Sequence, residues 1–237
     1  MSEPYVIYNG VKSSDIGLVV EKLPDFHRPA RMVELLYIPG RDGRLVRDEG
    51  SEEPYTTDMR INCMGQPLST LYAWLSGEGW MISSDEPDRA IWVSFHGQIK
   101  DTRFRVEGKN YDSLTVPVFC QPYRYHYPQP EAEKVNSTPG QATNAGTAPC
   151  LPVITIKGTG DVSILFGGVQ IDVEGMTDGI IVDSELMDCF SLDRSQLLNA
   201  MVEMDDFPVM QPGVTYIQWS GEGTIDEIII DRRCRDL

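Results

Sequence analysis

The sequence has few basic residues and an excess of acidic ones. Its 237 residues include 20 Lys and Arg against 36 Asp and Glu, which gives a formal net charge of −16 at pH 7. The excess is uneven: up to Tyr127 there are 14 basic and 18 acidic residues, and after it 6 and 18. Such a surface repels phosphate and argues against nucleic-acid binding by counterion release. The charge favours solubility, and it would also suit the wall of a passage through which DNA moves without sticking.

Long apolar runs are absent. None approaches the roughly 18 residues that a membrane-spanning helix needs. The first residues, MSEPYVIYNG, have neither the basic start nor the apolar segment of a signal peptide. We therefore expect a protein that is made and assembled in a cytoplasm and has no membrane partner.

Metal-binding and disulfide patterns are also missing. The five cysteines are scattered, odd in number and never arranged as CxxC, so free thiols are favoured over a disulfide framework or a zinc site. The three histidines share no HxxxH or HExxH spacing. We expect neither a metal nor a cofactor.

The sequence gives little support for an enzyme. It contains no GxGxxG and no GK[ST] motif, and Ser184 and Ser195 lie in no GxSxG elbow. All three histidines precede residue 127, so neither serine has a histidine in its own half of the chain. The acidic group of Asp183, Glu185 and Asp188 is more typical of strand ends and turns than of a hydrolase carboxylate pair.

The middle of the chain, residues 121–149, is rich in structure-breaking residues. Its five prolines, with glycines and asparagines between them, exclude a helix or a central strand. We interpret it as a joint, which predicts an N-terminal domain at 1–127, a linker at 128–149 and a C-terminal domain at 150–237.

The N-terminal half reads as strands around one short helix. Asn9-Gly10 after an apolar run predicts a hairpin with a type I′ turn. Pro67 fits the first turn of a helix whose apolar face would be formed by Leu68, Leu71, Tyr72 and Leu75. Further strands are expected at 18–20, 57–64, 79–83, 90–95, 104–107 and 114–120. This order predicts an α+β domain.

An arm at about residues 28–55 carries most of the charge of this half. A strand at 31–38, a turn at 39–43 and a return strand at 44–47 are expected there. Buried ions are costly unless paired, so the arm is either a solvated hairpin or reaches a neighbouring subunit and pairs its charges there. The candidate interface residues are Arg28, Arg31, Arg41, Asp42, Arg44 and Arg47.

The C-terminal half reads as short strands alone. Apolar runs are expected as strands at 153–157, 162–166, 169–173, 179–182, 186–190, 214–219 and 225–230, with glycine-rich turns between them. Such spacing predicts an antiparallel sandwich or jelly roll. We expect residues 197–201 to form a loop of the sandwich. The whole chain is thus expected to be mainly β.

Four aromatic residues are candidates for contacts with other molecules. Trp74 lies off the apolar face of the predicted helix, at the edge of the core or on a contact surface. Trp219, Tyr216 and Phe190 lie in predicted strands, where they could form a sugar-binding platform, although strand aromatics are more often core.

A series of short motifs along nearly the whole chain resembles the distal tail protein family of long-tailed phages with non-contractile tails. In the first half these are Tyr8-Asn9-Gly10, Ser14-Asp15, Gly17-Leu18, Ile38-Pro39-Gly40-Arg41-Asp42-Gly43 with Leu45 and Asp48, and Phe119-Cys120-Gln121-Pro122-Tyr123-Arg124-Tyr125. In the second they are Asn144, Gly146, Pro152, Ile154, Ile156, Gly158, Gly160, Val182-Asp183-Ser184-Glu185, Pro212-Gly213, Arg233 and Arg235.

The resemblance implies a structural protein of the virion tail tip or baseplate and not an enzyme. Its N-terminal domain would form a ring, usually of six subunits, around a channel for DNA ejection. The ring would join the tail tube protein to tail-tip proteins and to a receptor-binding protein, and residues 28–55 would be the belt around the next subunit. The C-terminal domain would be a galectin-like sandwich. The alternative is a carbohydrate-binding sandwich module used in host adhesion.

Overall fold

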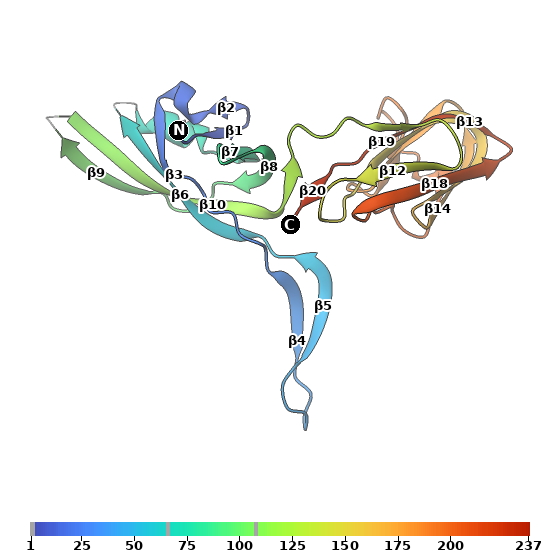
Figure 1. The fold of residues 1–237 in the computed structure, drawn as a ribbon, viewed down its shortest axis with the longest axis horizontal. Helices are drawn as coiled ribbons and strands as arrows, with labels where there is room; N and C mark the ends of the chain where they lie inside the picture. Colours follow the sequence, from blue (N-terminus) through green and yellow to red (C-terminus); the bar gives the residue numbers. More distant parts are fainter. Residues whose placement is uncertain (1–2, 65–66, 107–108) are drawn as a thin grey trace. The chain divides into compact units, whose positions relative to one another are not determined.

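The computed structural model describes residues 3–64, 67–106 and 109–237 of the chain. It divides into two compact units, residues 1–127 with Leu237 and residues 128–236. Both are built almost entirely of strands, and α1 is the one α-helix of the described ranges (Figure 1). The predicted fold class, mainly β, is therefore confirmed. None of the described helices is long and apolar enough to cross a membrane.

The first unit is an antiparallel sheet with one helix. Its elements outside the arm are β1 (Val6–Tyr8), β2 (Val11–Lys12), η1 (Ser13–Ile16), β3 (Leu18–Lys22), β6 (Tyr55–Met64), α1 (Leu68–Trp74), β7 (Glu78–Ser83), β8 (Glu86–Ser94), β9 (Lys100–Val106) and β10 (Lys109–His126). The strand order is β2, β1, β7, β8, β10, β6, β3, and β9 also pairs with β10. Val6, Met59, Ile61, Leu114 and similar side chains form its core. The strand expected at 104–107 lies within β9, except for Glu107, which is outside the described residues.

The predicted hairpin at the start of the chain is confirmed. Asn9 and Gly10 have φ values of 48° and 79°, both positive as a type I′ turn requires. The turn pairs Tyr8 with Val11, which sets β1 against β2. The sequence therefore determined this register locally.

The long strand β10 holds the first unit together, since it pairs with β6, β8 and β9. Leu114, Val116, Val118 and Cys120 are all fully buried, as the alternation predicted. The strand does not end where the joint was expected to begin, however. It continues to His126 through a register shift between Cys120 and Arg124. Pro122 falls inside this bulge, where a missing ladder N–H is tolerated.

The helix begins directly after Pro67, as predicted, but its buried face is narrower. Leu71 and Leu75 are buried, whereas Tyr72 is 43% exposed. The helix has only seven residues, or about two turns, which is too short for all four predicted apolar side chains to be buried. Trp74 packs partly against the core, and its ring meets that of Tyr8 edge to face at 6.2 Å.

The second unit consists of two sheets that share one strand. Its elements are β11 (Glu133–Val135), β12 (Gly140–Asn144), β13 (Val153–Phe166), β14 (Val169–Met176), β15 (Gly179–Asp183), β16 (Asp188–Phe190), η2 (Asn199–Met201), β17 (Val202–Glu203), β18 (Gly213–Gly221), β19 (Thr224–Asp231) and β20 (Arg235–Asp236). One sheet joins β11, β19, β13, β15 and β16, and the other joins β12, β18, β13, β14 and β17.

The shared strand β13 replaces the two separate strands that were expected at 153–157 and 162–166. Residues 153–159 pair with β19, and residues 162–166 pair with β18. Between them, glycines allow two backbones to touch: a Cβ on Gly158 would lie 2.0 Å from the carbonyl oxygen of Thr224. A Cβ on Gly223 would lie 2.4 Å from the carbonyl oxygen of Thr159. The glycines thus permit a bend in a continuous strand and not a turn between two.

Residues 128–149 belong to the second unit and are not a linker. Among the residues described, β11 pairs only with β19 and β12 only with β18, so both are edge strands. The buried Asn144 side chain fixes the following turn, because its Nδ2 donates to the carbonyl oxygens of Ala148 at 2.9 Å and Met210 at 3.0 Å. The prolines exclude a central strand here, but they do not exclude short edge strands between them.

Residues 197–201 are also more regular than the predicted loop. Asn199–Met201 form the 3₁₀ turn η2, and the following β17 pairs with β14. The Asn199 side chain holds this turn, since its Oδ1 accepts a hydrogen bond from the Cys189 amide at 2.6 Å. This contact is made by a polar side chain, so the pattern of apolar residues in the sequence did not predict it.

All five cysteines are buried free thiols. Burial raises the pKa of Cys120 and of Cys150 to about 12 and that of Cys189 to about 11. The expectation of unpaired thiols is confirmed, and each thiol serves as a small apolar core residue.

The close backbone contact at the bend in β13 predicts that one added methyl group will destabilise the protein. Gly223→Ala should lower the free energy of unfolding by about 1–3 kcal/mol, as overpacking does, because its Cβ would collide with backbone and not with a movable side chain. Urea unfolding followed by circular dichroism measures this. The neighbouring exposed Glu222→Ala is the control and should change stability by less than about 0.5 kcal/mol. Equal stability of the two variants would contradict the tight approach.

Candidate functional site

The predicted arm is a separate two-stranded hairpin. β4 (Arg31–Leu36) and β5 (Leu45–Glu52) pair with each other and, among the residues described, with no other strand. In Figure 1 they lie side by side with no further element beside them. β5 is longer than the return strand that was expected at 44–47, and nearly every residue of the hairpin is exposed.

The arm exposes apolar side chains on both of its faces. Leu35 lies opposite Val46 on one face, and Leu36 lies opposite Leu45 on the other. Leu35 is 50% and Val46 59% exposed, and Tyr37, near the turn, is 73% exposed. Met32, Val33, Ile38 and Leu45 add to the same surface. A lone hairpin is marginally stable in water, and exposed apolar surface of this kind is typical of interaction sites, so the arm is a candidate contact surface.

Arg31 fixes the base of the arm. Its Nε donates to both carboxylate oxygens of Asp48 at 3.0 Å, and its Nη1 donates to Glu52 at 2.9 Å. The guanidinium, with the Gly50 amide, lowers the pKa of Asp48. Because this pKa is lowered on folding, the stabilisation is present above the ordinary carboxyl pKa and is lost as pH falls through the lowered value.

The charged residues predicted to face a neighbour divide into two groups. Arg31 and Arg47 have partners inside the arm, since Arg47 lies 3.6 Å from Glu34. Arg28, Arg41, Asp42 and Arg44 are exposed and form no ion pair with any residue in the described ranges. These four remain available to another molecule.

The aromatic candidates of the second unit do not form one platform. Tyr216 is 66% exposed on the outer face of β18. Trp219 lies three residues further along the strand, so its side chain points to the opposite face, where it packs partly against the core. Phe190 is half-buried, with the Arg194 guanidinium 5.5 Å above its ring. Tyr216 is therefore left as a single exposed ring.

The acidic group at 183–188 forms a structural ion cluster. The Asp183 side chain is fully buried and accepts hydrogen bonds from Nη1 and Nη2 of Arg233 at 2.9 and 3.2 Å. Arg233 also donates to Glu185 at 2.7 Å. The cluster ties the end of the chain to the turn after β15. Among the residues described, no group of His, Cys, Asp and Glu could hold a metal ion.

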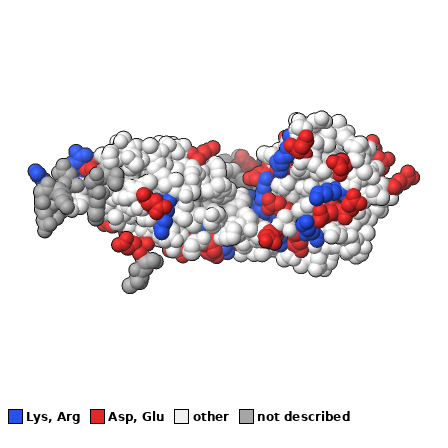
Figure 2. Space-filling view, turned by 90° about the horizontal axis from the view of Figure 1, so that it is seen from above, with Lys and Arg blue, Asp and Glu red and all other residues white. Residues whose placement is uncertain are grey.

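Several acidic residues of the second unit form ion pairs with basic residues. Lys134 and Lys157 both contact Glu227, at 3.2 and 3.1 Å, and Arg232 contacts Glu133 at 3.0 Å. Figure 2 shows lysines and arginines beside acidic residues on the face that it draws. The face in this view is therefore a mixture of both signs and not a continuous acidic field.

The apolar character of the arm was not identified from the sequence, because the many charged residues indicated either a solvated hairpin or an interface held by ion pairs. The sequence did contain a sign of it, because apolar residues occupy both even and odd positions of this strand: Met32, Val33, Leu35 and Leu36. Alternation would place apolar residues on one face only, so apolar residues on both faces of a strand without covering layers indicate two surfaces to be covered.

The cluster around Asp183 predicts a stability effect. Asp183→Asn should lower the free energy of unfolding by about 1.5–3 kcal/mol, the contribution of hydrogen bonds to a charged group. The matched control is Asp226→Asn, an exposed residue of β19 that should be neutral. Urea unfolding curves compare the two. Asp183→Asn with wild-type stability would show that the buried carboxylate contributes nothing.

Comparison with solved structures identifies a similar fold. No family model and no curated protein sequence matches the chain. A crystal structure of the SPP1 Dit (gp 19.1) protein, described as a paradigm of the hub adsorption apparatus in phages that infect Gram-positive bacteria, superposes with a TM-score of 0.75 at 17% sequence identity. The match covers 97% of this chain and 98% of the SPP1 protein. The resemblance inferred from the sequence is thus confirmed at the level of the fold: this chain has the fold of a phage distal tail protein.

Proposed function

We propose that this protein is a structural hub component of a phage tail, located at the tail tip of the virion. The observation that carries the proposal is the fold match with SPP1 Dit, a hub protein, over nearly the whole of both chains. A match of this extent includes both units and not only one common sandwich. The protein would act by assembly and not by catalysis.

The arm supports self-association as the mode of assembly. Its two apolar faces cannot be buried against each other within one hairpin, and a neighbouring copy of the chain can cover them. If the arm of each copy docks on a different surface of the next, the contact is heterologous, and it forms a ring when the rotation between neighbouring copies closes. We propose a ring of six subunits that surrounds a channel for DNA.

The unpaired charges of the arm would add specificity to this contact. Arg28, Arg41, Asp42 and Arg44 would meet opposite charges on the neighbouring copy, while the apolar side chains supply most of the affinity. The ring would connect the tail tube protein with tail-tip proteins and with a receptor-binding protein. Assembly would take place in the host cytoplasm.

The first test is the mass of the full-length protein by light scattering behind a sizing column, with negative-stain images of the same peak. We expect a mass several times 26.6 kDa and ring-shaped particles. A monomer over the whole concentration range would contradict self-assembly.

The arm itself is tested by a cross-strand pair of substitutions. Leu35→Asp with Val46→Asp should yield monomers, because two carboxylates would have to be buried in the contact. Arg41→Glu with Arg44→Glu should also dissociate the ring by reversing charge at the tip. Each variant should keep the wild-type circular dichroism spectrum.

The matched control is Val214→Asp, which changes a residue with similar exposure (51%) on β18 of the second unit. It should assemble as the wild type does. If the Leu35→Asp, Val46→Asp variant also assembled normally, the arm would not be the subunit contact.

A further inference from the structure

Three aromatic side chains lie together on the sheet of the first unit. Trp80 of β7 and Trp92 of β8 are cross-strand partners with ring centroids 5.1 Å apart, and the Tyr125 ring of β10 lies 5.0 Å from that of Trp80. Both contacts are edge to face. Because β8 lies between β7 and β10 in the sheet, the three rings form one aromatic patch that spans three strands.

The aromatic patch faces away from the core of its own unit. Met81, Ile91 and Val93, the sequence neighbours of the two tryptophans, are buried in that core. Side chains alternate between the two faces of a strand, so both indoles point to the outer face. Leu71 of α1 belongs to the same core, so the helix covers the core face and not the patch. Trp80 is accordingly 41% exposed.

The composition of the patch is typical of a contact surface. Tryptophan and tyrosine bury a large apolar area and are enriched among the residues that dominate binding free energies. Glu78 lies two residues before Trp80 and therefore on the same face of β7. It is exposed and forms no ion pair with a described residue. The patch thus offers aromatic rings beside a free carboxylate.

This chemistry is complementary to the tip of the arm. The tip carries two unpaired guanidinium groups, those of Arg41 and Arg44, against one carboxylate, that of Asp42, so its free charge is positive. A guanidinium can stack on an indole ring and donate hydrogen bonds to a carboxylate at the edge of that ring. The exposed apolar side chains of the arm can cover the remaining ring surface.

A second copy of the chain is the occupant that these observations favour. The arm and the patch are both exposed in one chain, so neither covers the other there. Every copy carries one arm and one patch, so in an assembly of identical copies each arm can find a patch. Since the two surfaces differ, the contact is heterologous, as a ring requires.

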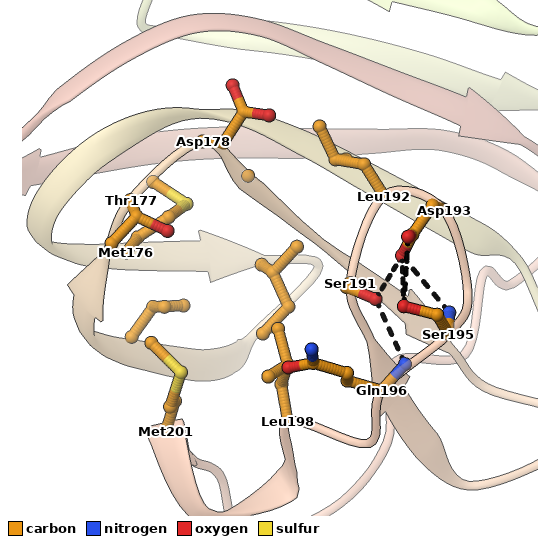
Figure 3. Close-up of a pocket in the computed structure, with 13 residues that line it drawn as sticks. Met176, Thr177, Asp178, Ser191, Leu192, Asp193, Ser195, Gln196, Leu198 and Met201 are labelled. Atoms are coloured by element: carbon orange, nitrogen blue, oxygen red, sulfur yellow. Dashed lines mark hydrogen bonds between the residues drawn. The ribbon is translucent and has the colours of Figure 1, made fainter.

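The other acidic recess of the protein is less suited to the tip. A hollow of about 490 Å³ at one end of the second unit is lined by Asp178 and Asp193 and by no lysine or arginine. The Asp193 carboxylate is turned towards the Ser191 and Ser195 hydroxyls, which donate to it at 2.6 and 2.8 Å, and the Asp178 carboxylate points away from the hollow (Figure 3). Neither carboxylate is therefore presented to an arginine inside it.

We propose that the arm tip of one copy docks on the aromatic patch of the next copy. A guanidinium of the tip stacks on Trp80 and pairs with Glu78. The proposal rests on the self-association proposed above and adds to it the surface that receives the arm.

An engineered disulfide tests this contact in the full-length protein. Arg41→Cys with Glu78→Cys, oxidised with copper phenanthroline in air and quenched with N-ethylmaleimide, should give a ladder of covalent oligomers on a non-reducing denaturing gel. All five native cysteines are buried, so the introduced thiols are the ones that react. The matched control is Arg41→Cys with Glu222→Cys, which places the second thiol at an exposed acidic position of the second unit and should give no ladder.

The contribution of the patch is measured with Trp80→Ala. Loss of the indole should raise the protein concentration at half-assembly about tenfold, as read by light scattering, while the circular dichroism spectrum stays that of the wild type. Tyr216→Ala removes an exposed ring of the second unit and should leave assembly unchanged.

The outcomes separate this proposal from the one on which it rests. Rings that form without the cross-link between positions 41 and 78, or rings that Trp80→Ala leaves equally stable, would overturn the patch as the receiving surface. Self-association would then stand, and the patch would be left to a different protein. A wild-type monomer at every concentration would overturn both proposals.

Discussion

A two-stranded hairpin has no interior, and this constraint decides where the apolar side chains of the arm can lie. Whatever apolar side chains the arm carries must remain in water or be covered by another molecule. The structure shows that it carries many, on both faces, while Arg31 fixes its base through Asp48 and Glu52. The ion pairs of Arg31 order the base of the arm within one chain, which lowers the cost of ordering its backbone when a partner binds.

Each of the two units is organised around one long strand. β10 carries β6 along one side and β9 and then β8 along the other. β13 passes from one sheet of the second unit to the other at Gly158 and Gly160. β10 therefore pairs with three strands of the first unit, and β13 pairs with four strands of the second, namely β14, β15, β18 and β19. A local distortion of either strand would be transmitted to more than one part of its sheet.

The sequence predicted the elements better than their connections. Local signals were sufficient for the Asn9-Gly10 turn, for the helix after Pro67 and for the alternation at Leu114 to Cys120, because each depends on neighbours along the chain. The continuity of β13 and the edge strands at 133–144 depend instead on pairing with strands that are distant in the sequence. Composition does not indicate such pairing. The ion cluster of Asp183 with Arg233 likewise joins residues from separate segments, so no spacing rule could indicate it.

Burial of the thiols has a consequence for the chemical stability of the chain. At neutral pH, thiols whose pKa lies near 11 or 12 are ionised in about one molecule in ten thousand or fewer. Oxidants and disulfide exchange act on the thiolate, so these cysteines would be inert both in a reducing cytoplasm and in air. A protein built in one medium and used in the other would thus keep the same covalent structure in both, without needing a disulfide in either.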